Sequence, residues 1–266
     1  VPFSGCGIRS NGRNGFSNCD GVISFSVGRD NARIGLSDCD GTITGCEIVG
    51  NAKVRTSSGD TSAGLWRCDA IIKDSLIAGN DYANLKECDA RISNCLIYNA
   101  RRSLGLEYGH GLWDCRGTIA GSIIAGNEGN GFSGCDLNIR SCTVTGNQRW
   151  GLYQNDGAIT HAVIWDNTLG PVSQSATPLF SSTTNPFFVQ PGFRDHANGG
   201  IWVHGDYHLS SDSPFIDAGD PFYANNKDSP TTDLDGNLRV VGPRVDLGAY
   251  EFQGTDCDGA DFDDDE

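Results

Sequence analysis

The sequence predicts an all-β fold, a parallel β-helix solenoid of about eight coils with twenty residues in each coil. Three observations carry this prediction: a motif that recurs every twenty residues, short apolar stretches between its copies, and an abundance of turn-forming residues. The chain of 266 residues holds 36 glycines and no methionine. Such a chain favours short strands joined by turns and leaves little room for long helices.

The first element of each predicted coil is a Gly-Leu-x-x-Cys-Asp motif, which occurs in seven versions between residues 15 and 156. Its cysteine column consists of Cys19, Cys39, Cys68, Cys88, Cys115 and Cys135. The spacings are 20, 29, 20, 27 and 20 residues, so the basic coil has twenty residues and two coils carry insertions of nine and seven. Solenoids show this kind of period because each coil is one structural unit stacked on the next.

Two further columns follow in each coil. Small side chains alternate with thiols at Ser26, Cys46, Ser75, Cys95, Ser122, Cys142 and Ala162, and Cys6 precedes them. Asparagine recurs at Asn11, Asn31, Asn51, Asn80, Asn127, Asn147 and Asn167, whereas Asn99 is one place out of register. The asparagines predict a ladder in which stacked amides bond to each other and to the turn backbone. Apolar residues between the columns predict the inward faces of strands, among them Ile43, Ile48, Ile71, Leu76 and Ile92.

With these features, residues 1–170 resemble the right-handed parallel β-helix proteins of the pectate-lyase-like superfamily. The resemblance implies a right-handed solenoid. That superfamily includes polysaccharide lyases, glycoside hydrolases and adhesins, so it implies a secreted or cell-surface protein whose partners are extracellular polysaccharide or neighbouring surface proteins.

Residues 171–253 contain Gly205-Asp206-Tyr207-His208-Leu209 and Val245-Asp246-Leu247-Gly248-Ala249-Tyr250. They resemble the C-terminal segment of large secreted bacterial β-helix surface proteins of planctomycete type. We expect this segment to form an irregular cap, since the last coil would otherwise expose strand edges. Residues 254–266 are expected to be a flexible acidic tail. The chain begins within a coil, at Cys6 and Asn11, which suggests part of a larger protein and possible self-assembly through an uncapped N-terminal coil.

Charge and hydropathy argue against nucleic-acid binding and against a membrane span. Residues 1–116 hold thirteen basic and thirteen acidic residues, whereas 117–266 hold six basic and twenty-one acidic ones, which together give the net charge of −15. No basic face is available to release counterions from phosphates, so nucleic acid is not expected to bind. No run of eighteen apolar residues occurs, so no membrane span is expected.

The cysteine and aspartate columns each allow more than one interpretation. Ten of the eleven cysteines fall in the two columns, where they interchange with Ser, Ala and Asn. This interchange favours buried thiols that pack as small apolar groups, although disulfides between coils remain open and a metal or redox role is the third alternative. An aspartate row follows the first column at Asp20, Asp40, Asp69, Asp89, Asp136 and Asp156. Turn hydrogen bonds explain it more simply than a shared Ca²⁺.

The two insertions, residues 52–63 and 100–110, predict loops that protrude from one edge of the solenoid with a groove between them. Charged and aromatic residues there suit sugar rings, and we expect ligand binding by Lys53, Arg55, Trp66, Tyr82, Arg102, Tyr108 and Trp113. Surface excursions without function are the alternative. Candidate catalytic residues are Arg101, Glu107 and His110, and Gly109-His110-Gly111 resembles a motif of polygalacturonase-like hydrolases.

The paired aspartates that glycosidic bond cleavage needs are not found at suitable positions. The sequence therefore favours a structural, carbohydrate-interacting module. A polysaccharide lyase or glycoside hydrolase acting in the groove is the alternative.

Calcium is the one cofactor that the sequence suggests, in a structural role at the C-terminal end. The candidate ligands are carboxylates at Asp233, Asp235, Asp256, Asp258 and Asp261, because hard oxygen ligands at this density suit Ca²⁺. A solvated tail without metal is the alternative.

Overall fold

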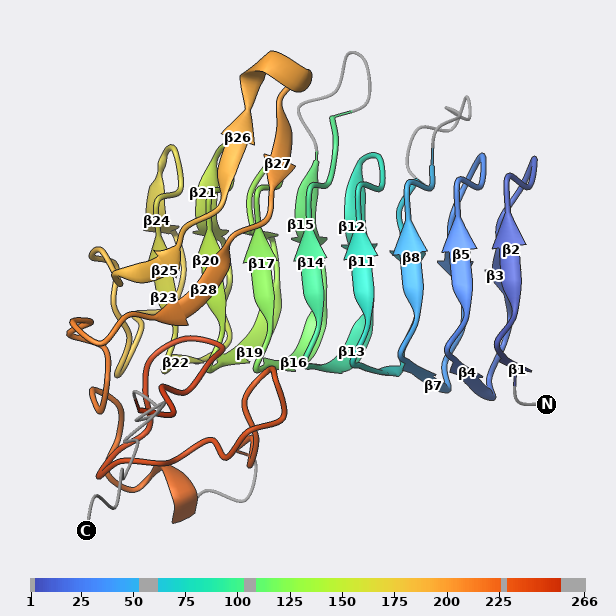
Figure 1. Cartoon of the computed structure of the whole chain (residues 1–266). Helices are drawn as coiled ribbons and strands as arrows, with labels where there is room; N and C mark the ends of the chain where they lie inside the picture. The colour runs from blue at the N-terminus through green and yellow to red at the C-terminus, as the bar shows by residue number, and fades with distance from the viewer. Residues whose placement is uncertain (1–2, 53–61, 103–108, 226–228, 255–266) are drawn as a thin grey trace, which may run out of the picture.

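The protein is a parallel β-helix with a C-terminal segment folded back on it (Figure 1). The structure, a computed structural model, describes residues 3–52, 62–102, 109–225 and 229–254. Three sheets of eight strands each run the length of the solenoid, and every pairing within them is parallel. This architecture confirms the predicted all-β fold and its eight coils.

The three sheets are called A, B and C in the order in which the chain visits them. Sheet A contains β1 (Phe3–Ser4), β4 (Val22–Ser24), β7 (Thr42–Thr44), β10 (Ile71–Lys73), β13 (Asp89–Ser93), β16 (Arg116–Ala120), β19 (Asp136–Arg140) and β22 (Ile159–Thr160). Sheet B contains β2 (Gly7–Arg9), β5 (Val27–Arg29), β8 (Glu47–Val49), β11 (Leu76–Ala78), β14 (Leu96–Tyr98), β17 (Ile123–Ala125), β20 (Thr143–Thr145) and β23 (Val163–Trp165). Sheet C contains β3 (Phe16–Ser17), β6 (Leu36–Ser37), β9 (Leu65–Trp66), β12 (Ala83–Lys86), β15 (His110–Trp113), β18 (Phe132–Ser133), β21 (Trp150–Tyr153) and β24 (Gly170–Ser173).

The register between coils reproduces the repeat read from the sequence. In sheet A, Ile23 pairs with Ile43 and Ile43 with Ile72, across one plain coil and one that carries the first insertion. Ile92 pairs with Ile119 across the second insertion. The register therefore continues from one side of each insertion to the other, although His110, counted in the second insertion, belongs to a strand of sheet C.

The core is a stack of aliphatic side chains and thiols inside the three sheets. Two of the predicted inward residues are wrong by one position. Ile71 is 47% exposed and Leu76 is half-buried, while their neighbours Ile72 and Ile77 are fully buried. Side chains alternate between the two faces of a strand, and an Ile-Ile or Leu-Ile pair does not itself show which member points inward.

The asparagine ladder runs through the core edge between sheets B and C. Side-chain amides donate to the next amide oxygen from Asn31 to Asn51 and from Asn51 to Asn80, both at 2.9 Å. Where the strict position holds Ala100, the ladder continues through Asn84, which accepts from Asn80 at 2.9 Å and donates to Asn127 at 3.2 Å. The ladder then continues from Asn127 through Asn147 to Asn167, with both links at 2.8 Å. Asn84 was not predicted to belong to it, because it lies only four residues after Asn80 in the sequence.

The ten described cysteines are all outside disulfides, and most are buried. The serines that alternate with them in the second column have a specific role. The backbone N–H of Cys46 donates to Ser75 Oγ at 3.1 Å, and that of Cys95 donates to Ser122 Oγ at 3.1 Å. Each hydroxyl thus satisfies a buried N–H of the preceding coil, which explains the alternation of small residues and thiols.

The aspartate row connects coils through the backbone. The N–H of Asp69 donates to Asp40 Oδ1 at 3.1 Å, and the N–H of Asp89 donates to Asp69 Oδ1 at 2.9 Å. Over the described ranges, no group of three or more His, Cys, Asp or Glu side chains is arranged to hold a metal ion.

The coil pattern extends past residue 170. Strand β24 pairs with β21, and Leu179 and Ser182 form parallel bridges with Thr160 and Val163. Pro171 is tolerated in β24 because this strand is at the edge of sheet C, where one side needs no N–H donor.

The C-terminal segment then returns along the solenoid. Its regular elements are the antiparallel pairs β25 (Phe188–Gln190) with β28 (Asp206–Leu209) and β26 (Phe193–Asp195) with β27 (Ile201–Val203), and the 3-10 turns η1 (His196–Asn198) and η2 (Tyr223–Asn225). Neither of these two short turns has the length or apolar character to cross a bilayer. Phe188, Tyr207 and Leu247 pack with Ile123 and Val163 of sheet B, so the predicted cap largely covers the side of the solenoid. Figure 1 shows this segment, in orange and red, alongside the later coils.

Candidate functional site

The two insertions leave the coils at the edge where the chain passes from sheet B to sheet C. Lys53, Arg55, Glu107 and Tyr108, which were expected to line it, are outside the described residues. The described members are Trp66, Tyr82, Arg101, Arg102, His110 and Trp113. The structure brings three of these together, Trp66, Tyr82 and Trp113, around a side chain that was not predicted to take part.

That side chain is Lys86, at the centre of a row on the outer side of sheet C. Trp66, Lys86 and Trp113 are register partners on β9, β12 and β15, so they stand side by side on adjacent strands. The Lys86 Nζ lies 4.6 Å from the centroid of the Trp113 ring and 5.4 Å from that of the Tyr82 ring. These distances allow cation–π attraction, which strengthens when the cation is shielded from water. Only 4% of the Lys86 side chain is exposed.

Glu87 and Tyr82 complete this arrangement, which we call the aromatic row: Trp66, Tyr82, Lys86, Glu87 and Trp113. The Glu87 carboxylate lies 3.1 Å from Lys86 Nζ through one oxygen, and its other oxygen accepts from Trp66 Nε1 at 3.1 Å. The Tyr82 and Trp113 rings are 4.9 Å apart. The charge of Lys86 is therefore compensated within the site, while both tryptophans remain half-buried with part of their surface open.

His110 lies next to Trp113 of the aromatic row. Its ring is 5.9 Å from that of Trp113 in an edge-on arrangement, and its Nδ1 accepts the backbone N–H of Asn130 at 2.9 Å. Burial, with the nearby charges of Arg149 and Arg102, lowers the pKa of His110 to about 4. The imidazole is thus neutral at physiological pH, and its Nδ1 lone pair is already used by the backbone. With a pKa this far below neutral pH and Nδ1 already engaged, His110 would be a weak general base.

The two arginines make hydrogen bonds with the backbone of the row or with Glu128. Arg102 donates through Nε to the carbonyl oxygen of Glu128 at 3.0 Å, and its backbone N–H donates to the Glu128 carboxylate at 2.7 Å. The Arg101 side chain is exposed, and its backbone carbonyl accepts from the N–H of Tyr82 at 2.8 Å. Both arginines thus hold the base of the second insertion.

Lys86 and Glu87 could have been found from the repeat. In the aligned motifs, Lys86 occupies the position of Trp66 and Trp113, and equivalent positions of a parallel solenoid stack directly. The basic residue between two tryptophans was therefore visible as a column. The prediction centred instead on the insertions, because loops commonly carry function.

The predicted calcium ligands Asp233 and Asp235 are engaged with the protein itself. Asp233 is fully buried, and its carboxylate accepts the backbone N–H groups of Asp235 at 3.1 Å, Asn237 at 2.8 Å and Glu251 at 3.3 Å. The Asp235 carboxylate accepts a hydrogen bond from His208 Nε2 at 2.8 Å. Asp256, Asp258 and Asp261 are outside the described residues, so calcium binding by the tail stays a prediction.

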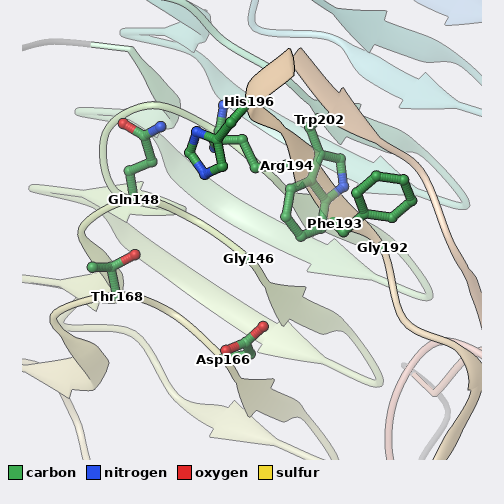
Figure 2. A pocket seen from close by; sticks show the side chains of 9 residues that line it. All are labelled: Gly146, Gln148, Asp166, Thr168, Gly192, Phe193, Arg194, His196 and Trp202. Atoms are coloured by element: carbon green, nitrogen blue, oxygen red, sulfur yellow. The ribbon is translucent and has the colours of Figure 1, made fainter. Parts of the chain in front are cut away.

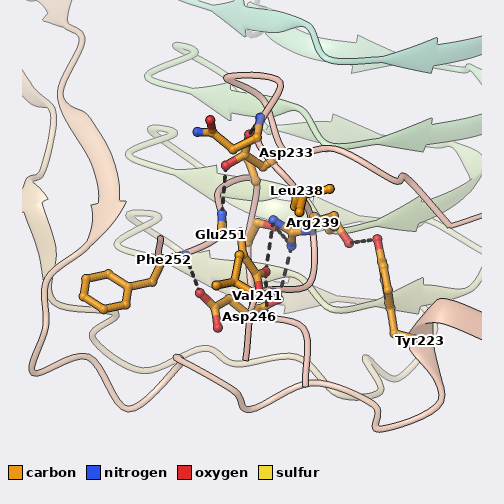
Figure 3. A network of polar contacts seen from close by, with 12 residues as sticks. Tyr223, Asp233, Leu238, Arg239, Val241, Asp246, Glu251 and Phe252 are labelled. Atoms are coloured by element: carbon orange, nitrogen blue, oxygen red, sulfur yellow. Dashed lines mark hydrogen bonds and ion pairs between the residues drawn. The ribbon is translucent and has the colours of Figure 1, made fainter. Parts of the chain in front are cut away.

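Asp233 belongs to a buried polar network (Figure 3), which also contains Arg239, Asp246 and Glu251. Arg239 Nη2 donates to the carbonyl oxygens of Asp246 at 3.1 Å and Gly248 at 2.6 Å, and its Nη1 lies 4.0 Å from the Glu251 carboxylate. The carboxylates of Asp246 and Glu251 accept backbone N–H groups of the surrounding loops. This network organises the C-terminal segment and is remote from the aromatic row in the sequence.

Comparison with known proteins supports the fold. A family profile described as a right-handed β-helix region matches residues 63–213. Among solved structures, the crystal structure of pectate lyase Pel9A is similar, with a TM-score of 0.60 and 17% sequence identity over 92% of this chain and 69% of that chain. At this identity the likeness shows the fold alone. No curated protein sequence gives a significant match.

Proposed function

We propose, from the premise that this chain belongs to the right-handed β-helix family, that it is an extracellular polysaccharide-binding module rather than an enzyme. The observation that carries the proposal is the aromatic row on sheet C. Two half-buried tryptophans flank a buried lysine, with a carboxylate and a tyrosine beside it. The similarity to a pectate lyase is consistent with a polysaccharide as the ligand.

The chemistry of the row suits a sugar chain. Adjacent strands of a sheet are about 4.8 Å apart, so Trp66 and Trp113, two strands apart, are separated by roughly 10 Å along the solenoid axis. Indole faces pack well against the apolar C–H faces of sugar rings, and the polar groups between them can bond to hydroxyls. A polysaccharide lying along the axis would contact both tryptophans in succession.

The favoured role is binding, because His110, one of the three candidate catalytic residues, is a poor proton acceptor. Its Nδ1 atom accepts a backbone N–H, and burial lowers its pKa to about 4. Of the other two candidates, Arg101 has an exposed side chain and Glu107 lies outside the described residues. Secretion and attachment within a larger surface protein, in contact with matrix glycans or neighbouring proteins, would fit this role.

Affinity electrophoresis tests the proposal. The purified chain is run through gels that contain polygalacturonate or a soluble neutral β-glucan, and we expect retardation by at least one of them. Trp113→Ala should weaken retention about tenfold, since it removes one aromatic platform. Tyr153→Ala is the matched control, because Tyr153 occupies the same outer column of sheet C two coils further on and lies outside the row.

Equal retention of Trp113→Ala and the wild type, or no retention in any gel, would refute the binding site. Release of unsaturated or reducing-end products, abolished by His110→Gln, would instead establish a lyase or hydrolase.

A further inference from the structure

A cavity lies at the later coils, between the solenoid and the hairpin formed by β26, η1 and β27 (Figure 2). Its volume is about 470 Å³. One wall comes from the turns after β20 and β23, with Gln148, Asp166 and Thr168. The opposite wall comes from the hairpin, with Phe193, Arg194 and His196. We call this cavity the hairpin pocket.

The hairpin is fixed firmly on the coils, so the pocket is preformed. Arg194 donates through Nη2 to the Gly126 carbonyl at 2.7 Å and through Nη1 to the Gly200 carbonyl at 2.6 Å. Trp202 lies against Gly126 and Gly146, where an added Cβ atom would come within 2.0 Å and 1.9 Å of the indole. These contacts join the hairpin to the turns after β17 and β20, and they hold both walls of the pocket in place.

The polar groups of the coil wall are available for a ligand. Within the part of the chain that the structure describes, the side chains of Gln148, Asp166 and Thr168 make no hydrogen bond to the protein. In Figure 2 the Asp166 carboxylate and the Gln148 amide lie on the same side of the cavity, across from the hairpin. Asp166 is exposed at the edge of the cavity, and partial desolvation there raises the pKa of its carboxyl.

We propose that the hairpin pocket binds one neutral hexose unit of a glycan. Its size is that of a small-molecule site, and few polar groups converge on it from two sides. The Asp166 carboxylate can accept hydrogen bonds from two adjacent sugar hydroxyls, while Gln148 and Thr168 can both donate and accept. The Phe193 ring, 52% exposed, offers an apolar surface to the sugar's C–H face.

A neutral sugar is favoured over an acidic one by charge. Both terminal nitrogens of Arg194 already donate to carbonyls, so Asp166 presents the less compensated charge to a ligand. The half of the chain that contains the pocket also carries the acidic excess, with twenty-one acidic against six basic residues. A uronate would therefore meet repulsion at close range and from the surrounding field. The inference rests on the proposed function for its ligand class, but the hairpin pocket and the aromatic row have no residue in common.

Saturation-transfer NMR and calorimetric titration of the whole chain with methyl glucoside, methyl galactoside and methyl mannoside test the inference. We expect at least one glycoside to bind in a one-to-one complex. Asp166→Asn should weaken it about tenfold, because a hydrogen bond to a charged acceptor is replaced by one to a neutral amide. Asp30→Asn is the matched control, since Asp30 has the same ladder position and nearly the same φ, 56° against 54°, in a coil without the hairpin.

Thr168→Trp should abolish binding by filling the cavity, and its folding is checked by an unchanged melting temperature. Binding that is absent for all three glycosides, or that survives both Asp166→Asn and Thr168→Trp, overturns the inference. The double variant Trp66→Ala, Trp113→Ala separates the two sites. It should lose polysaccharide retention and still bind the glycoside, whereas Asp166→Asn should lose the glycoside while Trp113-dependent retention persists.

Discussion

The coils and the C-terminal segment of this protein are held together by different means. In the coils, equivalent residues stack on each other, and asparagines, aspartates and serines of the columns bond to equivalent positions of a neighbouring coil. Among the described residues of 187–253, two short strand pairs are regular, and buried charged groups bond to loop backbone instead. Repetition can therefore satisfy buried polar groups by periodic ladders, whereas an irregular chain needs an individual partner for each group.

The largest expected effect comes from removing the cation of the buried network. Arg239→Ala leaves the carboxylates of Asp246 and Glu251 buried without it, and we expect a loss of about 3–5 kcal/mol in the free energy of unfolding of this segment. Limited proteolysis should then cut residues 187–253 while the far-ultraviolet circular dichroism of the coils persists. Arg244→Ala, at an exposed position of the same segment, is the control. Simultaneous melting of both regions would show that they form one cooperative unit.

The junction between the two regions gives the next effect. Gly146 and Gly134 both have a left-handed backbone, with φ of 63° and 62°, but only at Gly146 would a Cβ atom meet Trp202, while nothing lies within 4 Å at Gly134. Gly134→Ala should cost about 1 kcal/mol from the backbone alone. Gly146→Ala should cost about 3 kcal/mol, because overpacking against Trp202 is added.

A double-mutant cycle with Trp202→Ala, measured by urea denaturation, isolates the contact. In that background the two glycine substitutions should cost the same. A persisting difference would mean that Trp202 is not what the glycine accommodates.

Within the coils, Asn84→Ala should cost about 2 kcal/mol, since the buried Asn80 amide loses one of its two acceptors and the buried Asn127 oxygen loses one of its donors. Asn138→Ala, on the exposed face of sheet A with one bond to the next coil, serves as the control. Urea denaturation of both variants measures the difference. Equal stability of the two variants would show that the ladder does not depend on Asn84.

Asn84 also marks the limit of what the sequence could predict. The twenty-residue period predicted the stacked parallel strands and their register, because a parallel solenoid places equivalent residues in contact. It could not show that Asn84 replaces the missing asparagine of the next coil, since this depends on how a turn without a period folds. Likewise, Trp66, Tyr82 and Trp113 were predicted as binding residues, but the central Lys86 was not. The contact of Trp202 with Gly126 and Gly146 could not be predicted at all, because no repeat relates the C-terminal segment to the coils.

The last effect is a pH dependence that one buried carboxyl adds to the stability of the C-terminal segment. Burial and the neighbouring Asp246 raise the pKa of Glu251 to about 7, against the influence of Arg239 and two backbone N–H donors. In the unfolded chain a glutamate has a pKa of about 4.3. Between these two values the unfolded state releases its proton while the folded state retains it, so stability falls as pH rises from about 4.3 to about 7 and is level above. The raised pKa of His208, hydrogen-bonded to Asp206 and Asp235, acts in the same direction, so the slope of the wild type alone cannot be assigned to one group.

Glu251→Gln removes the titrating carboxyl. The melting temperatures of the wild type and of this variant are measured from pH 4 to 8. The difference, wild type minus variant, should decrease as pH rises and then level off. Glu47→Gln, in a coil remote from the network, is the control for loss of a carboxyl elsewhere in the chain. A flat difference for Glu251→Gln would mean that its carboxyl is charged in the folded protein throughout, and that Arg239 compensates it as fully as the ladders compensate the polar groups of the coils.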